Sequence, residues 1–162
     1  MEQKYSSKDT SINVVNKVYK QYNFPSNSVI LDFGGGKYDT NIKYMKERGV
    51  TVLVYDKYNR TEESNNEVLS YVAQNQPDYI VCSNVLNVIF EDEIIDDILR
   101  TIQEYDAKRV IFVIYEGDRS GVGRETSKGY QRNQKTKEYI PMIEKYFTIL
   151  SKKNGMVECR RK

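Results

Sequence analysis

The stretch that decides the fold is Val29-Ile30-Leu31-Asp32-Phe33-Gly34-Gly35-Gly36-Lys37. It begins with apolar residues, continues through an acid and closes with three consecutive glycines. This order predicts a buried β-strand that ends in a tight loop, where glycine lets the backbone approach a ligand closely. A second acid, Asp56, stands twenty residues after Gly36 and follows the apolar run Thr51–Tyr55. Together they are typical of an open α/β sheet that binds a nucleoside.

The composition predicts one ordinary globular domain. The chain has 162 residues, 39% of them hydrophobic, and a formal net charge of +2. This length predicts a single domain over residues 1–162 with a substantial core. No apolar run approaches the length of a bilayer span, and the polar N-terminus has no apolar signal segment. With two cysteines, the chain is expected to be reduced, cytoplasmic and without a membrane contact.

The chain contains no histidine, which removes the commonest general base and the commonest transition-metal ligand. With only Cys82 and Cys159 besides, no zinc site is expected, and nothing marks a magnesium site. We therefore expect no metal. Any chemistry must depend on a cofactor or on carboxylates, tyrosines, lysines and amides.

The remaining pattern predicts strands that alternate with helices, and hence a mostly parallel sheet covered on both faces. The predicted helices are 11–22, 39–48, 92–105 and 135–146. The predicted strands are 28–33, 50–55, 67–72, 78–83, 109–115, 147–152 and 156–160. The last two flank the turn dipeptide Asn154-Gly155 and should form an antiparallel hairpin.

The glycine loop does not match the two common phosphate-binding patterns. In the dinucleotide pattern G-x-G-x-x-G, Gly34 and Gly36 fit, but Asp39 stands at the third glycine. A negative side chain is unfavourable beside a pyrophosphate at a helix N-terminus. The P-loop pattern fails because Lys37 is followed by Tyr38 instead of Ser or Thr. A glycine turn without any ligand is a further alternative.

Asp32-x-Gly34-x-Gly36 followed by Asp56 resembles the first two motifs of the class I S-adenosylmethionine-dependent methyltransferases. The resemblance implies a Rossmann-like three-layer α/β sandwich, here with a mostly parallel seven-stranded sheet and a C-terminal antiparallel hairpin. It implies S-adenosyl-L-methionine as the cofactor, with its ribose hydroxyls on Asp56 and its methionine part near Asp32 and the glycines. An acidic pocket suits this ligand because it is a cation without a phosphate. The expected cofactor-binding residues are Asp32, Gly34, Gly35, Gly36, Asp56, Lys57, Ser83 and Asn84.

The segment 77–89 extends this resemblance, since such methyltransferases place a similar segment on their fourth strand, with the following loop beside the transferred methyl. Asn84 and Asn87 would lie there, and capping of the next helix is the alternative role for both. Methyltransferases that act on DNA amino groups carry [DNS]-P-P-[YFW] at this place. Ser83-Asn84-Val85-Leu86 has no proline, which argues against their mechanism.

A glycine-rich basic segment, 117–137, is expected to follow the fifth strand as a loop. Between Arg119 and Lys137 it has six basic residues and one acid, interleaved with Tyr130 and amides. Such a loop suits a mobile lid or a contact with nucleic acid, and a solvated loop is the alternative. With Val85–Ile89, it resembles methyltransferases associated with DNA phosphorothioation systems. The expected nucleic-acid contacts are Arg119, Arg124, Lys128 and Arg132.

The sequence thus predicts a methyltransferase whose acceptor is undetermined, with nucleic acid as one candidate. The alternative is a non-catalytic subunit that binds S-adenosylmethionine within a larger modification complex. A nicotinamide-dependent reductase is a third hypothesis, opposed by Asp39 and by the terminal hairpin. The candidate catalytic residues near the acceptor are Asn84, Glu116, Asp118 and Tyr130.

Overall fold

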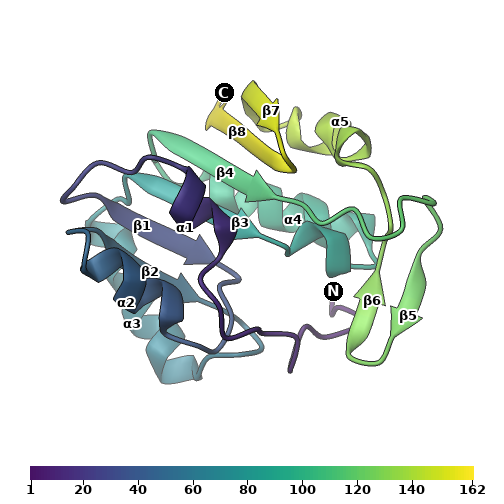
Figure 1. The fold of residues 1–162 in the computed structure, drawn as a ribbon, viewed down its shortest axis with the longest axis horizontal. Helices are drawn as coiled ribbons and strands as arrows, with labels where there is room; N and C mark the ends of the chain where they lie inside the picture. The colour runs from purple at the N-terminus through teal and green to yellow at the C-terminus, as the bar shows by residue number, and fades with distance from the viewer.

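A computed structural model describes residues 1–162 and centres on a six-stranded sheet with the order β2-β1-β3-β4-β8-β7 (Figure 1). The first four strands are parallel: β1 (Val29–Phe33), β2 (Thr51–Tyr55), β3 (Tyr79–Ser83) and β4 (Arg109–Val113). A hairpin of β7 (Phe147–Lys153) and β8 (Met156–Arg161) adds to β4 in the antiparallel sense. The expected mostly parallel sheet with a closing hairpin is confirmed.

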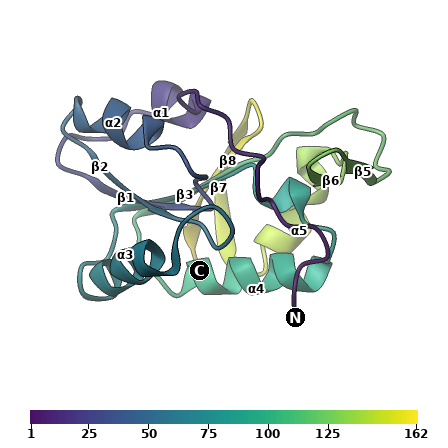
Figure 2. The same ribbon diagram turned by 90° about the horizontal axis from the view of Figure 1, so that it is seen from below.

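Helices cover both faces of the sheet, as Figure 2 shows. On one face lie α1 (Lys17–Gln21) and α2 (Thr40–Lys46); on the other lie α3 (Glu62–Gln74), α4 (Asp92–Gln103) and α5 (Ile140–Ile143). Successive strand residues point to opposite faces, so Ile30 packs into one core cluster and Leu31 into the other. No helix is both long enough and apolar enough to span a bilayer.

The prediction of a seven-stranded sheet was wrong, because segment 67–72 belongs to a helix. Val68 and Val72 lie one turn apart on α3, and both pack against the same core cluster. Thr61 caps this helix by accepting a hydrogen bond from the Ser64 N–H. The chain therefore passes from β2 to β3 through one helix, without a strand between them.

Three other segments differ from their predicted structure. The first helix begins at Lys17 instead of residue 11, since Asn16 is its N-cap and accepts from the Val18 N–H. The loop after β4 contains a small two-stranded sheet, β5 (Arg124–Thr126) and β6 (Gly129–Gln131). The helix expected over 135–146 is a 3₁₀ turn, η2 (Thr136–Glu138), followed by the single turn of α5.

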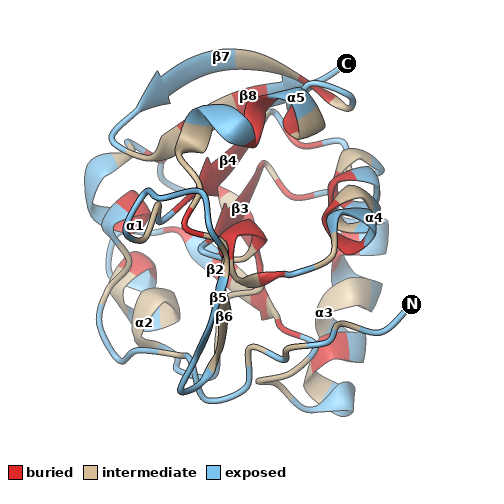
Figure 3. Cartoon of the chain, turned by 90° about the vertical axis from the view of Figure 1, so that its right-hand side faces the viewer, coloured by how far each residue is buried: buried red, intermediate tan, exposed pale blue.

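The carboxyl ends of the parallel strands meet at one edge of the sheet, which faces the viewer in Figure 3. From β1 the sheet continues to β2 on one side and to β3 and β4 on the other. Open α/β sheets bind ligands at such a switch point. The N-terminal segment, 1–16, crosses this edge from α1 to the β5–β6 hairpin (Figure 1).

Candidate functional site

A cavity of about 450 Å³ lies at the carboxyl edge of β1, β2 and β3. Its wall includes the glycine loop 34–36, residues 55–59 from the end of β2 onward, residues 83–85 from the end of β3 onward, part of α4 and part of the N-terminal segment. A volume of this size is usual for small-molecule sites. The cavity is therefore the candidate site of the chain.

The glycine loop is packed so tightly that it has no space for side chains. Gly34 and Gly36 have φ angles of +85° and +84°, in the left-handed region that favours glycine. A Cβ on Gly34 would lie 2.4 Å from Cγ2 of Val85, and one on Gly35 would lie 2.7 Å from Cγ of Asp32. Bare backbone therefore forms this part of the cavity wall, as a closely bound ligand requires.

Asp56 presents a fixed carboxylate to the cavity. Its Oδ1 accepts hydrogen bonds from the N–H groups of Tyr58 and Asn59, both at 3.0 Å. Its Oδ2 accepts from the Gly36 N–H at 2.8 Å, so one carboxylate joins the loops that follow β1 and β2. The side-chain amide of Asn65 in turn bonds the backbone N–H and carbonyl of Asp56 at 3.0 and 2.9 Å. The carboxylate is thus oriented as a hydrogen-bond acceptor for a ligand hydroxyl.

Asp32 lies beneath the glycine loop and is not part of the cavity wall. Its side chain is only 2% exposed, and this burial raises the pKa of the carboxyl group to about 6. The Tyr19 hydroxyl donates to Oδ2 at 2.7 Å, whereas Oδ1 is buried without any donor. Oδ1 is therefore a buried acceptor without a hydrogen-bond partner within the chain.

Arg60 secures the glycine loop from outside. Its Nε donates to the Gly36 carbonyl at 2.8 Å, and its Nη2 donates to the Tyr38 carbonyl at 2.8 Å. Its Nη1 bonds Asp39 at 2.7 Å. The acid at the third-glycine position is therefore neutralised by an arginine and lies outside the cavity wall.

The end of β3 and the residue after it form the far side of the site. Ser83 and Asn84 line the cavity, and the Asn16 side-chain amide donates to Oγ of Ser83 at 2.6 Å. Asn84 has a φ of +57°, which asparagine tolerates better than most residues, and its N–H donates to the Val113 carbonyl. Seven of the eight residues expected to bind the cofactor line this one cavity: Gly34, Gly35, Gly36, Asp56, Lys57, Ser83 and Asn84.

Of the candidate catalytic residues, only Asn84 lines the cavity. Glu116 accepts from the Thr136 N–H at 2.5 Å, and this bond lowers the pKa of the carboxyl group. Hydrogen bonds from Ser120 likewise lower the pKa of Asp118. Both carboxylates accept hydrogen bonds from residues of the segment that follows β4. Because these bonds lower their pKa, both are weaker bases. Tyr130 stacks on Tyr5 of the N-terminal segment, with 5.1 Å between ring centroids.

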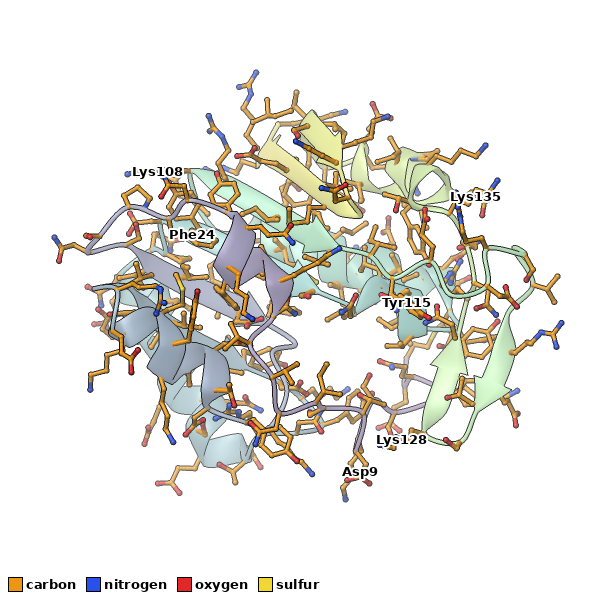
Figure 4. The ribbon with its side chains drawn as sticks, in the orientation of Figure 1. Asp9, Phe24, Lys108, Tyr115, Lys128 and Lys135 are labelled. Carbon is orange, nitrogen blue, oxygen red and sulfur yellow. The ribbon has the colours of Figure 1, made fainter.

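The expected nucleic-acid contacts fall into two groups. Arg132 is an internal anchor: its side chain is 11% exposed, it donates to the Ile89 carbonyl at 2.9 Å, and it pairs with Asp92 at 2.6 Å. It thereby fixes the connection between β3 and α4. The other three, Arg119, Arg124 and Lys128, are exposed on or near the β5–β6 hairpin, with Lys128 labelled at its turn in Figure 4.

Sequence reasoning missed four residues that shape the site. Asn65 comes from α3 and Arg60 from the turn before it, whereas Asn16 and Tyr19 come from the N-terminal part of the chain. None belongs to a motif, and each reaches the site only through tertiary packing. The sequence pattern predicted a helix over 11–22, but it does not indicate which aromatic ring reaches Asp32.

Comparison with models of protein families and with curated proteins finds no match to this chain. Solved structures do match. A TehB-like SAM-dependent methyltransferase from Corynebacterium glutamicum superposes with a TM-score of 0.51 and 14% identity, over 86% of this chain and 83% of that one. A SAM-dependent methyltransferase from Aquifex aeolicus superposes with a TM-score of 0.55 and 15% identity, over 88% and 87%. The chain has the fold of the SAM-dependent methyltransferases.

This likeness confirms the expected Rossmann-like methyltransferase fold, with six strands in the main sheet instead of seven. The narrower resemblance to methyltransferases of phosphorothioation systems is a separate matter and stays a prediction. The same holds for the roles of the individual site residues and for the acceptor.

Proposed function

We propose that the protein is an S-adenosylmethionine-dependent methyltransferase. The observation that carries the proposal is that the glycine loop and the Asp56 carboxylate face one cavity, at the switch point of a sheet with the methyltransferase fold. Asp56 would hold the ribose hydroxyls, and the loop 34–36 would approach the methionine part. When bound, the cofactor supplies an activated methyl group on a sulfonium. The chain itself would bind, orient and exclude water.

The hydrogen bonds of the loop support a ligand without phosphate. In a phosphate-binding loop, backbone N–H groups point at the anion. Here the Gly36 N–H is bonded to a carboxylate oxygen of Asp56, where a phosphate would meet a negative charge. A ribose hydroxyl would instead compete with this N–H for the same oxygen. Among the side chains of the wall, the acids Asp56 and Asp97 also outnumber the one cation, Lys57, which favours a cationic ligand.

A second function, a non-catalytic subunit that binds the cofactor, is favoured by one observation. Glu116, Asp118 and Tyr130 are absent from the cavity wall, so none of them meets an acceptor there. An enzyme with this site would act by orienting the cofactor and the acceptor, and the acceptor would be one that does not require a general base. A binding subunit would need only the cofactor half of the cavity.

Labelled cofactor separates these functions. The purified chain is incubated with S-adenosylmethionine that carries a radioactive methyl group, together with DNA, RNA or a pool of small metabolites. Label transferred to one of these supports the enzyme and identifies the acceptor class. Cofactor binding without transfer supports the subunit, and no binding contradicts the proposal. Asp56→Ala should abolish transfer, whereas Asp106→Ala, an exposed aspartate paired with Arg161, should not.

A further inference from the structure

The N-terminal segment 1–16, here called the strap, covers the cavity. It runs across the carboxyl edge of the sheet, between α1 and the β5–β6 hairpin (Figures 1 and 3). Eight of the residues in the cavity wall belong to it, Ser11, Ile12 and Asn16 among them. A ligand in the cavity would therefore lie between the strap and the sheet.

The C-terminal end of the strap, at Asn16, is fixed to the core of the protein. The Asn16 N–H donates to Oδ1 of Asn41 at 2.8 Å, and its side chain bonds Ser83. The helix that follows buries Val18 completely and places Tyr19 on Asp32. This end cannot move without loss of core packing and of a buried hydrogen bond, so it serves as the fixed end.

The other end is held by surface contacts alone. The Tyr5 ring stacks on Tyr130 and meets Phe90 edge-on, with centroids 5.1 and 6.2 Å apart. Its hydroxyl donates to Glu125 at 2.7 Å, and the Lys4 N–H donates to the Glu91 carboxylate at 2.8 Å. Such exposed contacts open far more readily than core contacts. The strap thus has a clasp, centred on Tyr5, that opens while the other end stays in place.

The middle of the strap has few contacts with the body of the protein. The Lys37 N–H donates to Oγ of Ser11 at 3.1 Å, the Thr40 hydroxyl donates to Oδ1 of Asn13, and Asn59 reaches the Ser7 carbonyl only at 3.4 Å. Ile12 and Val14 line the cavity yet are 71% and 58% exposed. Large apolar side chains that face a cavity in this way indicate a surface that a ligand covers.

We propose that the strap opens at the Tyr5 clasp to admit the cofactor and closes over it, and that the acceptor is a small molecule enclosed beneath the strap. The proposal rests on the proposed function. With both ends held, the strap occupies the edge along which a nucleic-acid strand would have to lie. The wall beside Ser83 also includes the side-chain amide of Asn41, which suits a polar acceptor recognised by hydrogen bonds. The exposed cations Arg124 and Lys128 are not part of this wall.

The release rate of S-adenosylhomocysteine, the demethylated product, tests the clasp. Tyr5→Ala removes the ring and the hydroxyl, and it should speed release by at least about fivefold, from the loss of one aromatic contact and one hydrogen bond. Tyr5→Phe keeps the ring and should lie between Tyr5→Ala and the wild type. Tyr71→Ala, which removes a 47% exposed tyrosine from α3, is the matched control and should release at the wild-type rate.

Release from Tyr5→Ala at the wild-type rate would overturn the strap while leaving the proposed function intact. A wild-type protein that does not bind S-adenosylhomocysteine would overturn both. Short single-stranded DNA and RNA, added to the complex, test the size of the acceptor: neither should bind tightly or alter the release rate. An oligonucleotide that binds the complex and slows release would place a strand at the mouth of the site and contradict the small acceptor.

Discussion

The Tyr19 hydroxyl donates a hydrogen bond of 2.7 Å to Oδ2 of Asp32, and both side chains are almost completely buried. Tyr19 belongs to α1 and Asp32 to β1, so this bond joins the N-terminal helix to the strand that leads into the glycine loop. Burial raises the pKa of Asp32 to about 6, although the bond from Tyr19 acts in the opposite direction. The ionised carboxylate is therefore less favourable in the folded chain than the protonated acid is.

The first prediction concerns stability and pH. Because the pKa of Asp32 is higher in the folded chain, the folded state binds this proton more tightly than the unfolded state. The resulting stabilisation is complete below about pH 4 and is lost as the pH rises through about 6. As the pH rises over this range, the unfolding free energy of the wild type should thus fall by on the order of 3 kcal/mol relative to that of Asp32→Asn. Urea unfolding between pH 4 and 7 measures the unfolding free energy of both proteins. If the two free energies change in parallel with pH, the prediction is refuted.

The second prediction concerns the glycine loop. Gly34 and Gly121 both have a positive φ, +85° and +78°, but only Gly34 has a neighbour in the way of a Cβ, namely Val85. Gly121→Ala should cost about 1 kcal/mol of unfolding free energy from backbone strain alone. Gly34→Ala should cost more, and it should also weaken cofactor binding because the loop after β3 is displaced. Equal losses of stability in the two variants, with unchanged binding, would contradict the tight packing of this loop.

The third prediction concerns Arg132, which the sequence pattern marked as a nucleic-acid contact. Arg132→Ala removes the buried guanidinium that bonds Ile89 and Asp92, and it should lower the unfolding free energy by about 1–3 kcal/mol. Arg124→Ala, on the exposed hairpin, should leave the thermal midpoint unchanged. Thermal unfolding of the two variants compares them directly. If Arg132→Ala unfolds at the wild-type temperature, its anchoring role is excluded.

Much of the architecture is local in the sequence and could be predicted from it. The four parallel strands are predominantly apolar runs. Asp56 directly follows β2, the strand after the glycine loop, so its position near Gly36 follows from the topology of a parallel sheet. Segment 67–72 was misread because Val68 and Val72 fit a strand of period two as well as a helix turn. In so short a segment, the spacing of apolar residues does not distinguish a helix from a strand.

The details of the site that escaped prediction depend on partners far away in the sequence. A basic run such as 128–137 looks solvated, yet Arg132 finds its partners more than forty residues earlier, at Ile89 and Phe90. Tyr5 meets Glu125 across 120 residues, so the strap and its clasp leave no trace in local composition. Local pattern predicts which elements form, but it does not predict which loops they bring together.

The central claim is that Asp56 and the glycine loop bind S-adenosylmethionine, and calorimetry tests it most directly. Wild type should bind S-adenosylmethionine or S-adenosylhomocysteine with micromolar affinity, and Asp56→Ala should weaken binding by more than about tenfold through the loss of a charged acceptor. Asp106→Ala should bind as the wild type does. Preference for a nicotinamide dinucleotide, or equal binding by Asp56→Ala and wild type, would contradict the account.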